Sequence, residues 1–186
     1  MGKSFVIAVF FCCFCFFQSS AFGRGGTTMT LVVSSPAFAN KQSIPVRYTC
    51  EGEDISPPLQ FTGVPEGTAS LALIVDDPDA PDPAAPKMTW VHWLLYNLPP
   101  DTSGLPEAVT SFPPGTELGI NDFGRTRYGG PCPPIGEHRY RFKLYALDTM
   151  LPDLGRPDKE TLLHAMDGHI LEQALLIGLY QKRGND

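Results

Sequence analysis

Polar residues that can exchange protons or bind ligands interrupt three apolar stretches of this sequence. Asp76 and Asp77 follow the run LALIV, His92 lies within WVHWLL, and His138 opens the run HRYRFKLYAL. Imidazole and carboxylate groups can transfer protons, bind anions or ligate metals. One histidine in an apolar stretch is most often a core residue with a hydrogen-bonded partner. Two histidines and a carboxylate at such positions together predict a small polar pocket at the mouth of an apolar sandwich.

The carboxylates belong to the stretch VDDPDAPD at 75–82, which is both acidic and stiff. Pro78 and Pro81 fix the backbone angle φ, so the chain loses little entropy when it holds Asp77 in place. A calcium loop is disfavoured, because the stretch has no glycine and no distant bidentate glutamate. We expect the other three carboxylates to face solvent or to cap local turns: Asp76, Asp79 and Asp82.

Two classes of function are compatible with these residues. In a hydrolase or a metal-dependent enzyme, Asp77, His92 and His138 would supply a general acid and base, or two imidazoles and a carboxylate for a metal. The sequence has no G-x-S-x-G nucleophile motif and neither the H-x-x-x-H nor the H-E-x-x-H spacing of metal ligands. We therefore favour a binding protein that is not an enzyme and that needs no metal or cofactor. The enzyme is the alternative.

The N-terminal residues have the pattern of a signal peptide. Lys3 precedes an unbroken apolar run at 5–17, and small residues suited to cleavage after Ala21 follow it. A membrane-spanning helix needs about 20 residues, so this run is too short to be one. We predict a signal peptide at 1–21, a flexible lead-in at 22–30 and an exported protein, periplasmic or secreted, with no stable membrane anchor after cleavage. An uncleaved anchor is the alternative.

Three of the five cysteines lie in the predicted signal peptide, so Cys50 and Cys132 remain in the exported chain. An even pair in an oxidising compartment predicts one disulfide, and two buried thiols are the alternative. The net charge is −6. This charge excludes the basic surface that is typical of nucleic-acid-binding proteins.

The elements that must position these residues are mostly strands. The run at 71–75 is apolar on both faces and predicts a central strand, while 138–147 alternates and predicts a half-buried one with His138 facing inward. A helix should begin after Asp158 and stop at Gly168. We predict a mainly β fold, an antiparallel sandwich in one domain at 31–183, with one or two short peripheral helices. The expected strands are 30–38, 44–49, 71–75, 88–98, 138–147 and 174–181.

Four motifs resemble those of a known family: DPDAP (77–81), VHW (91–93), NDFGRTRYGGPCPP (121–134) and GEHRYRFKLYALD (136–148). In this order they resemble the phosphatidylethanolamine-binding proteins, also called Raf kinase inhibitor proteins, and most of all their bacterial branch. The resemblance runs from Leu31 to Lys182. It implies an antiparallel β-sandwich of Greek-key character with an anion pocket near the surface.

The resemblance also implies which residues form the pocket. The family's pocket positions fall on Asp77, Pro81, His92, Gly130, Pro131, His138 and Tyr140. Cys132 stands where many members have a second proline, so a Cys50–Cys132 bond would hold the pocket loop covalently. The implied ligand is a phosphate-bearing small molecule or a phospholipid head group. The implied protein partner, which this chain would inhibit or modulate, is a protease or another extracytoplasmic enzyme.

A carboxylate beside an anion site requires compensating positive charge. Asp77 would stabilise imidazolium at His92 and His138, whose unperturbed pKa values are about 6.5, and the three groups would then sum to about +1. Alternatively, Asp77 accepts hydrogen bonds from an amine or hydroxyl of the ligand. Both versions predict tighter phosphate binding as the pH falls from about 8 to about 6.

Overall fold

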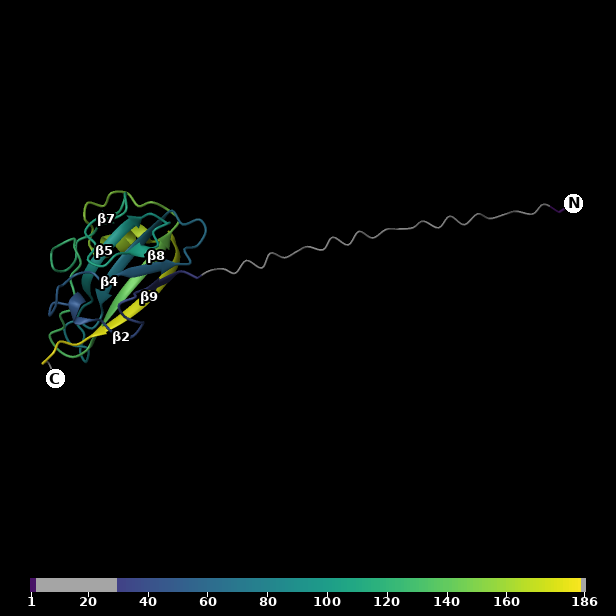
Figure 1. Ribbon diagram of the computed structural model, residues 1–186. Helices are drawn as coiled ribbons and strands as arrows, with labels where there is room; N and C mark the ends of the chain where they lie inside the picture. The colour runs from purple at the N-terminus through teal and green to yellow at the C-terminus, as the bar shows by residue number, and fades with distance from the viewer. Residues whose placement is uncertain (3–29, 185–186) are drawn as a thin grey trace.

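The computed structural model describes residues 1–2 and 30–184 (Figure 1). The predicted signal peptide (1–21) and lead-in (22–30) therefore lie almost entirely outside the described residues. Within the described part of the chain, no helix is long and apolar enough to cross a membrane.

The larger of two sheets has six strands in the order β2-β9-β8-β4-β5-β7 (Figure 1). All neighbouring strands in it are antiparallel except β2 and β9, which run parallel. Every residue of β4 is buried, because the strand lies inside the sheet and both of its faces are covered. In spatial order the strands are Gln42–Ser43 (β2), Ile170–Tyr180 (β9), His138–Leu147 (β8), Ser70–Asp77 (β4), Trp90–Leu98 (β5) and Glu117–Leu118 (β7).

A three-stranded sheet packs against one face of the larger sheet. Its strands lie in the order Val32–Ser34 (β1), Leu59–Thr62 (β3) and Gly104–Leu105 (β6). One continuous apolar core fills the space between the two sheets, and its buried members come from both of them: Val33, Phe61, Leu73, Phe142 and Leu176. This face of the larger sheet is called the inner face below.

The single α-helix of the described residues, Lys159–Met166 (α1), covers the opposite face, called the outer face below. The Asp158 carboxylate accepts a hydrogen bond of 2.8 Å from the backbone N–H of Thr161 and so caps the helix. A second apolar cluster lies beneath the helix: Ala72, Ile74, Leu94, Tyr96, Leu162 and Met166. Successive residues of β4 thus alternate between two cores, which explains why the stretch is apolar without interruption.

The structure confirms the predicted fold class and most of its elements. Strands are present within 30–38 and at 71–75 and 138–147, and Asp158 caps a short helix. The strands predicted at 88–98 and 174–181 are also present, with their ends shifted to Trp90–Leu98 and Ile170–Tyr180. The strand predicted at 44–49 is wrong: Val46–Tyr48 forms a 3-10 turn (η1). Pro45 lacks a backbone N–H and precedes this turn, and the Thr49 hydroxyl donates a 2.8 Å hydrogen bond to the carbonyl of Val46.

Candidate functional site

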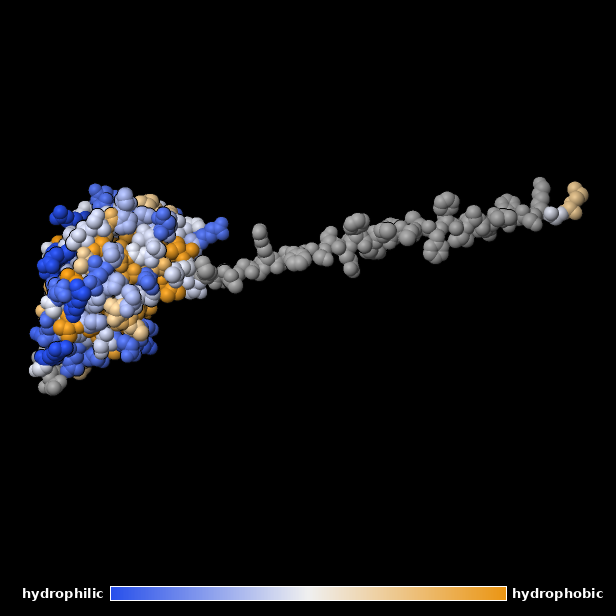
Figure 2. Space-filling view, in the orientation of Figure 1, coloured by the Kyte–Doolittle hydropathy of each residue, from blue (hydrophilic) through white to orange (hydrophobic). Residues whose placement is uncertain are grey.

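A cavity of about 520 Å³ opens at the end of the sandwich where β4 stops and β8 begins. Apolar side chains make up most of its wall, among them Met88, Trp90, Phe123 and Pro133, and Lys87 also lines it. Figure 2 shows apolar residues in orange among hydrophilic ones on one face of the domain. Five of the seven predicted pocket residues line this one cavity: Asp77, Pro81, His92, His138 and Tyr140.

Asp77 and His138 form a buried pair, with 2.7 Å between Asp77 Oδ2 and His138 Nδ1. The other ring nitrogen, Nε2, lies 3.0 Å from the carbonyl oxygen of Ile135. A carbonyl can only accept, so Nε2 carries a proton, and an ionised Asp77 also requires a proton on Nδ1. The geometry therefore suits an imidazolium at His138 whose charge is balanced by Asp77. In that form the carboxylate and the imidazolium cancel each other's charge.

His92 lies on β5 and is in a different state. Its Nδ1 donates a 2.6 Å hydrogen bond to the carbonyl of Gly129, which leaves Nε2 as an acceptor in the neutral ring. Burial lowers the pKa of His92, although the hydrogen bond to Gly129 and the charge of Asp77 act in the opposite direction. His92 is thus a neutral imidazole at pH 7. The prediction of two imidazolium rings is wrong for this residue, because the sequence does not reveal how completely the ring is desolvated.

Tyr140 on β8 lies beside both histidines. Its ring centroid is 5.1 Å from that of His92 and 6.5 Å from that of His138. Burial raises the pKa of Tyr140, and the charge of Asp77 acts in the same direction, so the hydroxyl stays protonated. The hydroxyl faces the backbone of Cys132 but makes no hydrogen bond of ordinary geometry with the described residues. The hydroxyl is itself buried, so it is a donor beneath the cavity wall without an ordinary partner among the described residues.

Gly130 and Pro131, in contrast, do not line the cavity, and the following residues 132–134 do. The backbone N–H of Gly130 donates a 2.6 Å hydrogen bond to Asp54, and the carbonyl of Pro131 accepts one of 3.1 Å from Cys50. A Cβ on Gly130 would lie 2.6 Å from the carbonyl oxygen of Tyr48, so this position has no room for a side chain. The proline pair at 133–134 is nearer to His138 in the sequence than Gly130 and Pro131 are. This proximity could have indicated that the pair lines the cavity.

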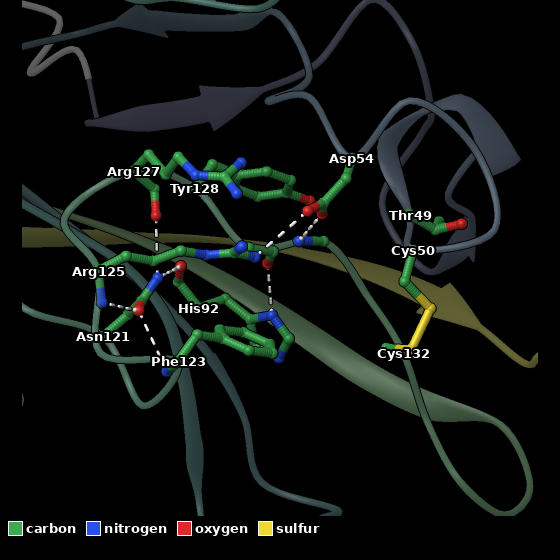
Figure 3. Close-up of polar contacts among 12 residues, drawn as sticks. Thr49, Cys50, Asp54, His92, Asn121, Phe123, Arg125, Arg127, Tyr128 and Cys132 are labelled. Atoms are coloured by element: carbon green, nitrogen blue, oxygen red, sulfur yellow. Dashed lines mark hydrogen bonds and ion pairs between the residues drawn. A yellow bond between two sulfur atoms is a disulfide. The ribbon is translucent and has the colours of Figure 1, made fainter.

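The loop that carries these residues is fixed at several points (Figure 3). Cys50 and Cys132 are joined by a disulfide with Cα atoms 5.4 Å apart. The Asn121 side chain donates 2.9 Å hydrogen bonds to the carbonyls of His92 and Arg127 and accepts two from backbone N–H groups. Asn121 and Asp54 also fix this loop, and no local pattern indicates this role because neither residue adjoins a histidine in the sequence.

Comparison with known proteins agrees with this geometry. Residues 34–181 match the profile of a family described as phosphatidylethanolamine-binding protein. The chain belongs to this family. A protein named UPF0098 from Methanothermobacter thermautotrophicus is 52% identical over 149 residues, which cover 78% of this chain and 95% of that protein.

Two solved members of the family are similar in structure. The phosphatidylethanolamine-binding protein homologue CT736 of Chlamydia trachomatis has a TM-score of 0.77 at 45% identity, covering 83% of this chain and 99% of that one. E. coli YbcL, whose structure is described as that of a new member of the mammalian PEBP family, has a TM-score of 0.74 at 31% identity, covering 82% and 99%.

Two aspartates of the acidic stretch differ from the prediction, since Asp76 and Asp79 are buried ion-pair partners. Asp79 accepts three hydrogen bonds from Arg139, at 2.9 Å from Nε, 2.6 Å from Nη2 and 2.9 Å from the backbone N–H. Asp82 behaves as predicted and caps a turn through the backbone N–H of Ala84, at 2.8 Å. Most partners of Asp76 and Asp79 come from β8, whose register against β4 the sequence does not display, and Lys159 of α1 also pairs with Asp76.

No group of three or more His, Cys, Asp or Glu side chains within residues 1–2 and 30–184 is arranged to hold a metal ion. In this member of the phosphatidylethanolamine-binding protein family, the cavity instead presents the imidazole of His92, the ring of Tyr140 and the hydrogen-bonded Asp77–His138 pair.

Proposed function

We propose that this chain is a binding protein without catalytic activity, whose cavity takes one small ligand through an anionic, phosphate-type group. The observation that carries the proposal is the convergence of Asp77, His92, His138 and Tyr140 on one cavity. These residues come from three strands that are far apart in the sequence. Membership of the phosphatidylethanolamine-binding protein family supports the same class of function.

The anionic group is expected to bind between His92 Nε2 and the Tyr140 hydroxyl. Tyr140 donates a hydrogen bond, and His92 becomes a second donor once it takes up a proton. A bound anion raises the pKa of His92, which burial holds below its ordinary value of 6.5. Binding is therefore linked to protonation, and the affinity should increase as the pH falls below about 6.5. This window replaces the range between pH 8 and 6 expected from two charged rings.

The apolar wall gives the ligand a second requirement. Met88, Trp90 and Phe123 contribute large apolar surfaces, and a ligand that covers them gains about 25 cal/mol for each Å² removed from water. A phosphomonoester with an apolar or aromatic body should therefore bind more tightly than inorganic phosphate. Lys87, at the same cavity, supplies positive charge that the Asp77–His138 pair does not.

The test is a titration with inorganic phosphate and with phenyl phosphate, followed by NMR of the four histidine rings. We expect saturable shifts at His92 and His138 and tighter binding of phenyl phosphate. We expect no shift at His164 or His169, because neither lines the cavity. Tyr140→Phe should weaken both ligands about tenfold, the effect of one lost hydrogen bond to a charged group.

Equal shifts at all four histidines, or an unchanged affinity in Tyr140→Phe, would contradict the proposal. The same samples test the enzyme alternative with a chromogenic phosphoester. Turnover that disappears in His92→Ala would assign this chain to the hydrolases.

We also propose that the chain is exported, because an apolar run of signal-peptide length precedes a domain that contains a disulfide. Mass spectrometry of the protein made in a bacterial host tests this, and a mature N-terminus after Ala21 is the expected result. A mass that retains residues 1–21 would contradict cleavage. The predicted protein partner, a protease or another extracytoplasmic enzyme, stays a prediction.

A further inference from the structure

On the outer face of the six-stranded sheet, three cations surround one carboxylate. Asp76 Oδ1 lies 2.7 Å from Arg141 Nε, and Asp76 Oδ2 lies 2.8 Å from Lys143 Nζ and 2.6 Å from Lys159 Nζ. The Asp76 side chain is fully buried, whereas the side chains of Arg141, Lys143 and Lys159 are 28%, 15% and 22% exposed, respectively. The negative charge is thus sealed beneath the positive ones. Arg141, Lys143 and Lys159 are called the outer cationic cluster below.

The outer cationic cluster has more charge than its partner neutralises. Three cations against the one carboxylate of Asp76 leave a local charge of +2, in a chain whose net charge is −6. Within residues 30–184, none of the three cations forms an ion pair with any other carboxylate. The two carboxylates next to Lys159 in the sequence do not neutralise this surplus positive charge.

Asp158 is committed to the N–H of Thr161 as the helix cap. Glu160 lies instead with His164 and Asp167 around a separate surface hollow along α1. Lys159 itself is the first residue of α1, where the helix dipole disfavours a cation. Its position therefore adds to the unbalanced positive potential instead of relieving it.

The cluster also has hydrogen-bond donors to spare. Each cation reaches Asp76 through one nitrogen, whereas an ammonium carries three N–H groups and a guanidinium five. Burial lowers the pKa of Lys143, whereas Asp76 raises it. The neighbouring positive charges of Arg141 and Lys159 lower this pKa further. A second anion beside these residues would relieve that repulsion.

We propose that the outer cationic cluster binds a tetrahedral oxyanion, a phosphate or sulfate group, at a site separate from the cavity. The group sits on the solvent side of the three cations, opposite the buried Asp76, and uses their remaining N–H donors. The two sites cannot share one ligand, because Asp76 and Asp77 are consecutive residues of β4 and point to opposite faces of the sheet. This site does not depend on the proposed function of the cavity.

The experiment is a titration of the full mature domain with sodium sulfate, followed by the amide and side-chain NMR signals of Arg141, Lys143 and Lys159. Sodium chloride at the same ionic strength is the reference, since a screened nonspecific effect depends on ionic strength alone. We expect saturable shifts in sulfate only. Lys159→Gln should weaken binding about tenfold, the effect of one lost charge-assisted contact, and Arg141→Gln should do the same.

Lys182→Gln is the matched control, because it removes one positive charge at the end of β9, away from the cluster. Its sulfate affinity should equal that of the unaltered protein. His92→Asn removes a cavity residue and should also leave the outer-face shifts unchanged, so failure of one site does not obscure the other. No saturable shift in sulfate, or an affinity that Lys159→Gln leaves unchanged, would overturn the proposal and give the three cations a purely structural role.

Two further titrations identify the source of the oxyanion. Inorganic phosphate and glycerol 3-phosphate share the same tetrahedral group but differ in the attached body. Equal affinities would assign the site to a free oxyanion, and tighter binding of glycerol 3-phosphate would assign it to a phosphate carried by a larger molecule.

Discussion

Asp76 and Asp77 are the same residue type at consecutive positions, yet their surroundings have little in common. Asp77 faces the inner side of the sheet, where one imidazole balances it at the wall of an open cavity. Asp76 faces the outer side, where three long cationic side chains close over it. The period of two along a strand assigns each carboxylate to a different layer. The comparison shows that the layer, and not the residue type, decides whether a buried charge remains available to a ligand.

The largest expected effect is that of Asp76→Asn. This change leaves three partly buried cations without their counter-charge, and breaking a buried ion pair from one side costs about 3–5 kcal/mol. Urea denaturation should show this loss in the free energy of unfolding. Asp82→Asn, which keeps a side-chain oxygen for the turn at Ala84, should stay within about 0.5 kcal/mol of the unaltered protein. A small effect of Asp76→Asn would mean that the cations are already well solvated.

Asp77→Asn should affect ligand binding more than stability. The amide keeps a hydrogen-bonding oxygen for His138 but removes the charge that supports the imidazolium, and a lost charge-assisted hydrogen bond costs about 1.5–3 kcal/mol. Calorimetric titration with phenyl phosphate should show a changed affinity in this variant. The affinity of Asp76→Asn should equal that of the unaltered protein. Equal effects of the two variants on binding would contradict the separation of the two faces.

The two regions should also lose stability in different pH ranges. The pKa of His92 is lowered by burial, so on acidification the unfolded chain takes up this proton first and stability falls as the pH drops below 6.5. Burial alone would raise the pKa of Asp76, but hydrogen bonds from Lys143, Lys159 and Arg141 outweigh it and lower the pKa. The contribution of Asp76 is therefore intact above 3.8 and is lost as the pH falls through its lower value in the folded state.

Unfolding free energies measured between pH 8 and pH 3 check both ranges. His92→Asn should flatten the decline just below 6.5, and Asp76→Asn should flatten only the acid limb below 3.8. If either variant flattened the decline in unfolding free energy in the other variant's pH range, the assignment of the two declines to His92 and Asp76 would be wrong.

The smallest expected effect is that of Lys159→Gln on stability. Asp76 keeps Arg141 and Lys143, and the helix loses a cation from its unfavourable end, so we expect a cost of about 1 kcal/mol or less. Thermal unfolding measures this change. A loss as large as that of Asp76→Asn would mean that Lys159 alone compensates the carboxylate.

The sequence predicted those parts of the molecule that depend on local pattern. The apolar run at 71–75 and the alternation after His138 identified β4 and β8. The polar residues that interrupt apolar stretches predicted that Asp77, His92 and His138 share one pocket. Properties that depend on how distant strands and segments pack against one another could not be predicted. Asp76 faces Arg141 only because of the register between β4 and β8, and the neutral state of His92 follows from burial that several distant segments create. The cavity is lined by residues 132–134 instead of the predicted Gly130 and Pro131. This difference depends on the path of the loop, which the side chains of distant residues fix.

The disulfide places one sulfur-bearing residue, Cys132, in the wall of the cavity and its partner, Cys50, in a turn 82 residues earlier in the chain. The wall of the cavity therefore depends on a covalent bond to a distant segment of the chain, as well as on the apolar core. We expect reduction of this bond to weaken the binding of phenyl phosphate, and calorimetric titrations with and without a reducing agent measure the change.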